Sequence, residues 1–125
     1  MQEITLKNVK DLLESGSLEF IATQEAVCLP ILQRIYKKMK IGIKFEGIKV
    51  KGSRIVDGHH RYICSELSKV EITKYNWGIA SAIEDYNWSE VTIREYDYET
   101  PERIHEHNVR DAKLNDVDIS ILNDL

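Results

Sequence analysis

The sequence predicts an α+β fold, because segments with helical and with strand-like spacing of apolar residues follow one another along its 125 residues. Apolar residues recur every three to four positions in 6–13 and 31–39, which is typical of amphipathic helices. Between residues 41 and 56 they alternate and are interrupted by glycines, which is typical of a β-hairpin. We therefore expect a single domain over 1–125, with a small mixed sheet and flanking helices.

Each expected element has its own boundary signal. Gly16 follows the first apolar stripe as a stop, and Pro30 suits the first turn of the next helix. Thr100 and Pro101 form a typical helix start, an N-cap followed by a first-turn proline. From the N-terminus, the expected elements are a helix at 6–13, a strand at 18–22, a helix at 30–40, a hairpin at 41–56, a helix at 59–69, strands at 71–77 and 91–98, a helix at 101–112 and a helical tail at 116–125. The apolar run 79–83 fits either type of element.

Composition narrows the class of protein. The formal net charge of −4 argues against a protein that coats nucleic acid through bulk positive charge. No stretch approaches the ~18 apolar residues of a membrane span, and the N-terminus lacks the basic start and apolar run of a signal peptide. The two cysteines, Cys28 and Cys64, are too few for a disulfide scaffold. We expect reduced thiols in a cytoplasmic protein, with Cys64 as a small core residue.

The segment 57–62, with the sequence DGHHRY, carries the clearest chemical signal. A hairpin strand ends at Asp57, Gly58 turns the chain, and a helix begins. The first backbone N–H groups of a helix have no internal partners, and the helix dipole adds partial positive charge there, so such a turn binds anions. Gly58 lets the backbone approach a ligand closely. His59, His60 and Arg61 add three donors expected to be cationic, and arginine offers a planar fork that matches phosphate oxygens.

Positive side chains at a helix start are electrostatically unfavourable unless an anion joins them. This mismatch is the physical reason to expect a phosphate ligand at Gly58, His59, His60 and Arg61. The alternative is structural: Arg61 pairs with Asp57 or with a glutamate, and the two histidines fill gaps in the packing.

The segment Arg54–Tyr62 resembles the signature of the ParB/sulfiredoxin superfamily, in which a strand, a glycine turn and an H-R or R-R pair open a helix. The resemblance covers about residues 30–77. It implies a ParB-like domain of bacterial or phage-like type whose turn grips nucleotide phosphates, with His60 and Arg61 in the place of that pair. The ligand it implies is a nucleotide such as ATP, ADP or CTP, with or without Mg²⁺.

Departures from the family pattern exclude some of its activities. Sulfiredoxins carry their catalytic cysteine where this chain has His59, and Cys64 lies most of a helical turn further on, so we expect no sulfinic-acid reductase. Too few residues follow the resemblance for the helix-turn-helix region of partition proteins, so sequence-specific DNA binding is not expected. Relatives that phosphorylate free serine with ADP use similar D-G-H-H-R sequences. A nuclease activity, also claimed for relatives, is disfavoured by the negative charge.

Acidic residues are the candidates for catalysis. Asp57 adjoins the anion turn and can hold Mg²⁺ or orient a neighbour, and Glu46 lies beside Gly47 where the strand phase changes. Glu25, before the Pro30 helix, is a further acid or base candidate. The cluster His105-Glu106-His107 is interpreted as a solvated helix face, because alternate helix residues point about 200° apart and do not easily share a metal ion. No metal site is predicted.

The sequence therefore predicts a nucleotide- or phosphate-binding protein, with phosphotransfer or nucleotide hydrolysis as its candidate activities. The alternative is a non-catalytic module that uses the same turn for a protein or DNA partner, for example in a mobile-element or toxin–immunity system. A second catalytic motif, which would favour an enzyme, is not evident in the sequence.

Overall fold

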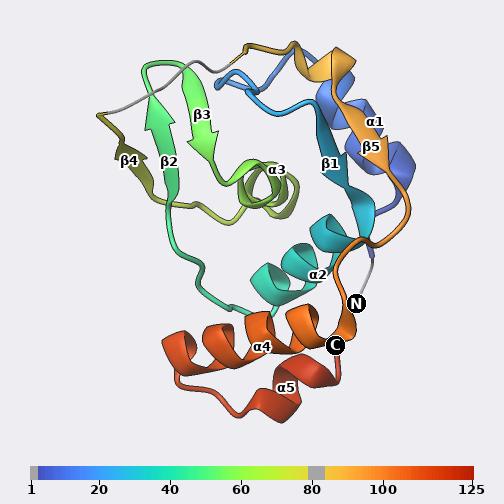
Figure 1. Cartoon of the computed structure of the whole chain (residues 1–125), viewed down its shortest axis with the longest axis vertical. Coiled ribbons are helices and arrows are strands. Elements are labelled where there is room, and N and C mark those ends of the chain that lie inside the picture. The colour runs from blue at the N-terminus through green and yellow to red at the C-terminus, as the bar shows by residue number, and fades with distance from the viewer. Residues whose placement is uncertain (1–2, 79–83) are drawn as a thin grey trace.

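The protein has a mixed α+β fold, seen in a computed structural model that describes residues 3–78 and 84–125 (Figure 1). Helices and strands alternate along the chain as the sequence predicts. Their bounds are α1 Leu6–Glu14, β1 Ala26–Cys28, α2 Leu29–Lys40, β2 Ile48–Lys51, β3 Arg54–Asp57, α3 His59–Ser68, β4 Lys74–Asn76, the 3₁₀ helix η1 Trp88–Glu90, β5 Thr92–Arg94, α4 Pro101–Asn115 and α5 Ile119–Asn123.

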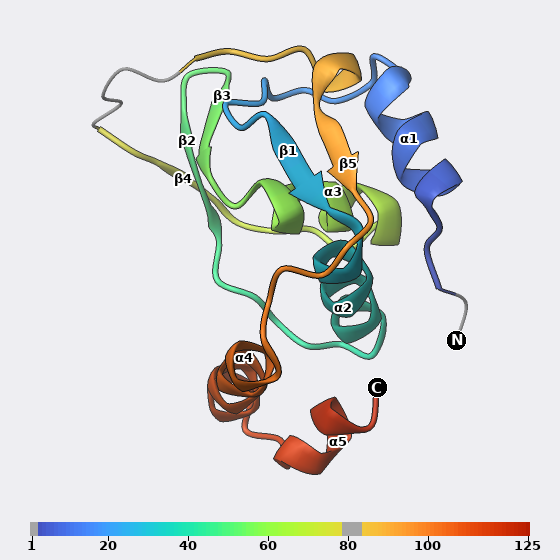
Figure 2. The same cartoon turned by 45° about the vertical axis from the view of Figure 1, so that its right-hand side comes forward.

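Two small sheets frame the helix that carries the DGHHRY turn. Strand β2 is the centre of a mixed sheet, antiparallel to β3 and parallel to β4, in the order β3-β2-β4. Strands β1 and β5 form a separate parallel pair. Helix α3 lies between the two sheets and packs on α2 (Figures 1 and 2). The first turn of α3 is therefore held from several sides.

The main core forms around α3. Tyr62, Ile63 and Cys64 are fully buried there together with Ile48 of β2 and Ile55 of β3. Burying one such side chain contributes about 1.5–3 kcal/mol, so this packing fixes the position of the helix. Cys64 is a core residue, as expected, and both cysteines are free thiols.

Helices α4 and α5 lie at one end of the molecule, below α2 (Figure 2). A second, smaller apolar cluster forms there around the buried residues Ile43, Ala112 and Leu122. The contact with α2 includes a buried ion pair, in which Nζ of Lys38 lies 2.8 Å from Oδ2 of Asp111. Both side chains are less than a tenth exposed. Specific polar contacts thus help to set the position of α4 relative to α2.

The expected hairpin is shorter than predicted, and the strand assignment of 41–47 is wrong. Strand β2 begins only at Ile48. Before it, the side chain of Asn115 takes the place of a strand partner: its Oδ1 accepts from the Lys44 N–H at 2.6 Å, and its Nδ2 donates to the Lys44 carbonyl at 3.0 Å. The alternation of Ile43 and Phe45 therefore comes from packing against α4 and α5, not from a sheet.

The other elements differ from prediction mainly in length. The helices at 6–13, 30–40, 59–69 and 101–112 are confirmed within a few residues. The strand at 18–22 is reduced to isolated bridges of Ile21 and Ala22, and β1 was not predicted. The late strand covers only Thr92–Arg94 of the expected 91–98. Residues 79–83 lie outside the described part. No helix in the described part is both long and apolar enough to span a membrane.

The buried ion pair gives a stability prediction. Substitution Asp111→Ala leaves the Lys38 ammonium buried without a partner, so the free energy of unfolding should fall by about 3–5 kcal/mol in urea titrations. The double variant Lys38→Met/Asp111→Leu removes both charges and should recover most of that loss. Substitution Asp11→Ala breaks the exposed pair with Lys7 and should change little. A small loss of unfolding free energy in Asp111→Ala would show that the Lys38 ammonium becomes hydrated in the variant.

Candidate functional site

Helix α3 begins at a glycine that no other residue can readily replace. Gly58 is its N-cap and has a left-handed backbone, with φ of +102°. A Cβ built on Gly58 would lie 2.6 Å from Cγ2 of Ile48 and 2.8 Å from Nη2 of Arg61. Ile48 is fully buried and has little room to move. Conformation and close packing both require glycine here. The sequence predicts the glycine turn, but for a different reason, the close approach of a ligand.

The first turn of α3 has free donors. No side chain caps the helix, and the first helical N–H to find an acceptor is that of Tyr62, which bonds the Gly58 carbonyl at 2.9 Å. Within the described part of the chain, the N–H groups of His59, His60 and Arg61 have no acceptor. These amides, together with the helix dipole, form a local positive potential of the kind that binds anions.

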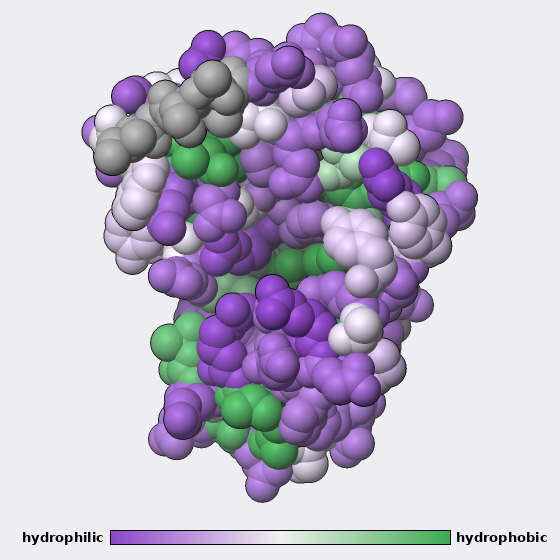
Figure 3. All heavy atoms as spheres, viewed as in Figure 1, coloured by the Kyte–Doolittle hydropathy of each residue, from purple (hydrophilic) through white to green (hydrophobic). Residues whose placement is uncertain are grey.

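This turn lines a cleft of about 1130 Å³ that separates α3 and the 44–47 segment from α4. Figure 3 shows the molecule hollowed across its middle, with mainly hydrophilic residues around the opening. The charged side chains of the lining are Arg34, Lys38, Lys44, Arg61 and Arg110, and the acids Glu46, Asp57, Glu99 and Asp111. Five cations against four anions give this surface a formal charge of +1, although the whole chain carries −4.

The two histidines of the turn are neutral, which corrects the expectation that they are cationic. Nε2 of His59 accepts from the Thr23 N–H at 2.9 Å, and Nε2 of His60 accepts from the Cys28 N–H at 3.0 Å. Burial lowers the pKa of both to about 4. Since each Nε2 is an acceptor, the ring proton lies on Nδ1. Each histidine thus ties a distant backbone amide to α3 and keeps one N–H donor.

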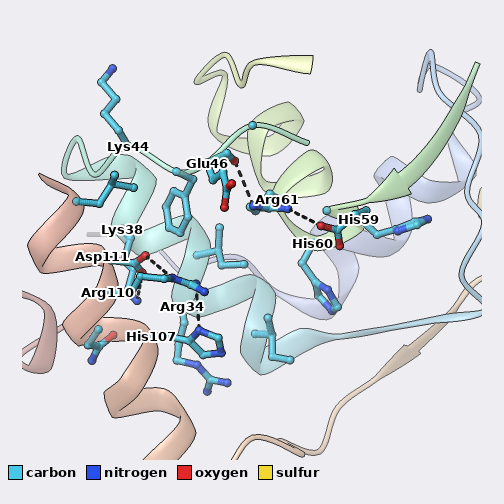
Figure 4. Close-up of a pocket in the computed structure, with 18 of the residues that line it drawn as sticks. Arg34, Lys38, Lys44, Glu46, His59, His60, Arg61, His107, Arg110 and Asp111 are labelled. Atoms are coloured by element: carbon cyan, nitrogen blue, oxygen red, sulfur yellow. Dashed lines mark hydrogen bonds and ion pairs between the residues drawn. The ribbon is translucent and has the colours of Figure 1, made fainter. Parts of the chain in front are cut away.

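Arg61 is the one side chain of the turn that carries positive charge. Its Nη1 donates to the Glu46 carbonyl at 3.2 Å, and its Nη2 lies 3.5 Å from Oδ2 of Asp57 (Figure 4). The guanidinium folds back across Gly58 and is about four-fifths buried. The pairing with Asp57 matches the structural alternative considered for the sequence, and it also holds the guanidinium in place beside the free amides.

Two of the three candidate acids lie at the cleft, and the third does not. Asp57 and Glu46 both line the cleft, and both are exposed. Figure 4 shows Glu46 next to Arg61 at the edge of the cleft. Glu25 does not line it; its carbonyl accepts from the Thr92 N–H, next to the β1–β5 pair. Among the described residues, no group of three or more His, Cys, Asp or Glu side chains is placed to hold a metal ion.

The opposite wall of the cleft is formed by residues that sequence reasoning missed. Helix α4 contributes His107, Arg110 and Asp111, and α2 contributes Arg34 and Lys38. The sequence predicts only a solvated face for the 105–107 cluster, and it assigns no functional role to Lys38. Neither segment carries a local signal for a cleft, because the wall exists only where the two helices meet.

Comparison of the chain with known protein families, with curated proteins and with solved structures gave no match.

The left-handed turn predicts a graded pair of glycine variants. Gly58→Ala combines a strained φ with a collision against Ile48, and should lower the free energy of unfolding by about 3 kcal/mol or more. Gly42→Ala has a similar φ of +93° but open space around the new methyl group, so it should cost only about 1–2 kcal/mol. Equal losses of unfolding free energy in the two variants, measured by denaturant titration, would mean that the residues around Gly58 shift to accommodate the methyl group.

The neutral histidines predict acid sensitivity. In the unfolded chain they bind protons as the pH falls through 6.5, whereas in the fold they stay neutral until about pH 4. The unfolded state therefore binds more protons in this window, and stability falls as the pH is lowered from 6.5 toward 4. The loss is on the order of 3 kcal/mol for each histidine.

Urea titrations at several pH values would measure this slope. His59→Gln should make it shallower between about pH 6.5 and 5, where carboxylates contribute little, while the exposed His105→Gln should leave it unchanged. A slope that is the same in all three proteins would show that His59 is protonated in the fold.

Proposed function

We propose that the cleft binds a phosphate-bearing ligand, most specifically a nucleotide, with a phosphate group at the Gly58–Arg61 turn. The observation that carries this proposal is the uncapped start of α3, whose three N–H groups have no acceptor among the described residues and adjoin the cleft. Gly58 has no side chain that could cap these groups, and a ligand oxygen can accept their hydrogen bonds.

The side chains around the turn suit this role. Arg61 is already fixed by Glu46 and Asp57, so little side-chain entropy is lost when it contacts a phosphate. The neutral rings of His59 and His60 offer Nδ1–H donors. Asp57 would repel a phosphate, and its exposed carboxylate fits a Mg²⁺ ion shared with phosphate oxygens, which would neutralise that repulsion.

A nucleotide is preferred over inorganic phosphate for two reasons. The cleft is large for a single phosphate, and its lining includes apolar or aromatic side chains, such as Phe45 and Tyr75, that can contact a base. The resemblance of Arg54–Tyr62 to the ParB/sulfiredoxin signature implies the same ligand class. ATP, ADP and CTP are the ligands we would test first.

Phosphotransfer or nucleotide hydrolysis is the activity that the cleft could support. Such chemistry needs an acid or base near the phosphate as well as charge stabilisation. Glu46 is one candidate for the first need, since it lines the cleft and its backbone holds Arg61. The amides of α3 and Arg61 meet the second.

A non-catalytic binding module is the second candidate, and one observation favours it. Strand β4 is at the edge of its sheet, and its residues Lys74, Tyr75 and Asn76 are all exposed, followed by the half-exposed Trp77. Exposed aromatic residues at a free sheet edge are typical of surfaces that bind another chain. Nucleotide binding without turnover would support this role.

The ligand proposal predicts a thermal shift and a specific loss of affinity. A nucleotide at a hundredfold its dissociation constant should stabilise the fold by about 2.7 kcal/mol. Arg61→Ala should weaken binding by about 1.5–3 kcal/mol in isothermal titration, the contribution of a charge-assisted hydrogen bond. ATP, ADP, CTP, GTP and inorganic phosphate, each at millimolar concentration with and without Mg²⁺, form the test panel.

Arg103→Ala is the matched control, because Arg103 is exposed on α4, is absent from the cleft lining and pairs only loosely with Glu106 among the described residues. It should leave affinity unchanged, and circular dichroism should confirm that both variants fold. Unchanged melting temperatures across the whole panel would refute the proposal. Unchanged affinity in Arg61→Ala would make Arg61 a purely structural residue.

A further inference from the structure

His107 on α4 has a polar partner close to each ring nitrogen. Its Nε2 lies 2.9 Å from Oε2 of Glu99, and Nη2 of Arg110 lies 3.1 Å from its Nδ1. Arginine is only a donor and carboxylate only an acceptor. The neutral ring must therefore carry its proton on Nε2, toward Glu99, and present an unprotonated Nδ1 on the side of Arg110.

Glu99 is fixed in turn. Its carboxylate is 15% exposed, and its Oε1 accepts from Nη2 of Arg34 at 2.6 Å. The same guanidinium pairs with Asp97, whose Oδ1 also accepts from the Glu99 N–H at 3.0 Å. This arrangement of a buried carboxylate behind a histidine fixes both the tautomer and the orientation of the ring, as it does in hydrolases and transferases with a histidine base.

The Glu99–His107 pair belongs to the same cleft as the α3 turn. Both residues line it together with Gly58 and His60. Burial lowers the pKa of His60, and the Glu99 carboxylate opposes that shift, which shows that the two groups interact electrostatically. The close-up in Figure 4 shows His107 on the α4 side of the pocket and Arg61 on the α3 side.

Arg110 is the group that covers Nδ1 of His107, and it is weakly held. Its side chain is 67% exposed, and its nearest carboxylate, that of Asp111, lies 3.8 Å away and already pairs with Lys38. A ligand phosphate is a stronger partner for a guanidinium than a neutral imidazole nitrogen. Ligand binding can therefore draw Arg110 away and expose the unprotonated nitrogen.

We propose that His107 is the general base of the cleft and that Glu99 is its positioning residue. This inference rests on the proposed function, because the reaction it serves is attack of a water or alcohol hydroxyl on a nucleotide phosphate held at the α3 turn. As the nucleophile oxygen bonds to phosphorus, its proton passes to Nδ1 of His107. The bond from phosphorus to the bridging oxygen breaks, and that oxygen leaves with the electron pair. Glu99 stabilises the resulting imidazolium.

The neighbouring histidine shows why this assignment is specific. His105 is exposed on another face of α4 and has no partner among the described residues. It also contributes nothing to the cleft lining. The two histidines thus differ in partners, although they are two positions apart, and His105 provides a matched control on the same helix.

The test measures binding and turnover separately on the full chain. Thermal shift and titration with ATP, ADP, CTP and GTP, each with Mg²⁺, report binding, and phosphorus NMR reports hydrolysis in water or transfer to glycerol as a hydroxyl probe. His107→Gln should keep nucleotide affinity within about threefold and lower kcat at least a hundredfold, the scale of general base catalysis. His105→Gln should behave as wild type.

A positioning role for Glu99 has its own readout. Glu99 is held by Arg34 and faces Nε2 of His107, so it should act on the reaction through the position of the ring. Glu99→Gln should therefore lower kcat. Nitrogen NMR of wild type should show the proton of the His107 ring on Nε2, and a mixture of tautomers in Glu99→Gln.

The possible failures are distinguishable. Absence of binding by every nucleotide in the panel refutes the proposed function, and this inference with it. Binding without turnover in wild type refutes His107 as a base while the binding proposal stands. Turnover that survives in His107→Gln, or a His107 ring with its proton on Nδ1, likewise overturns the assignment and returns Glu46 as the candidate base.

Discussion

The left-handed backbone of Gly58, packed against Ile48, is the constraint on which the cleft depends. It lets β3 end and α3 begin within one residue while both stay in the core. The helix start is thereby directed at the cleft and not at solvent or at a capping side chain. His59 and His60 then bond the amides of Thr23 and Cys28, so the same turn also anchors the segment that leads through β1 into α2.

The two walls of the cleft are held by different kinds of interaction. The α3 wall stands on apolar packing with α2 and the mixed sheet. The α4 wall combines a small apolar cluster with the Lys38–Asp111 pair, the Arg34–Glu99–His107 chain of contacts, and the bonds between Asn115 and Lys44. Replacing a buried ion pair by apolar residues often costs little, whereas removing one partner costs several kcal/mol, so Lys38 and Asp111 need each other more than the fold needs the pair.

Local signals explain how much the sequence could predict. The sequence correctly predicts that α3 starts at Gly58 and that α4 starts at Thr100. Both starts are set by residues within a few positions of the helix end. The neutral state of His59 and His60 could not be predicted, because it comes from backbone amides more than thirty residues away.

The α4 wall was missed for a related reason. Charged and polar residues such as Lys38, His107 and Asp111 are typical of a solvated surface. Lys38 and Asp111 are buried only because they pair with each other across 73 positions of the chain. Similarly, the alternation of Ile43 and Phe45 reports contact with a later helix, which no short window of sequence contains.

The two walls of the cleft come from different parts of the chain, and this affects the order in which the cleft forms during synthesis. Helix α3 and the mixed sheet lie within residues 48–76, whereas the facing wall needs residues 99–115 in addition to Arg34 and Lys38 of α2. N-terminal segments leave the ribosome first, and the core around α3 can pack only once Trp88, Val91 and Ile93 have also emerged. The anion-binding amides would then exist on the nascent chain before the residues that enclose them, and a ligand would meet an open, weakly binding surface until α4 docks. Tight ligand binding would thus follow the synthesis and docking of α4.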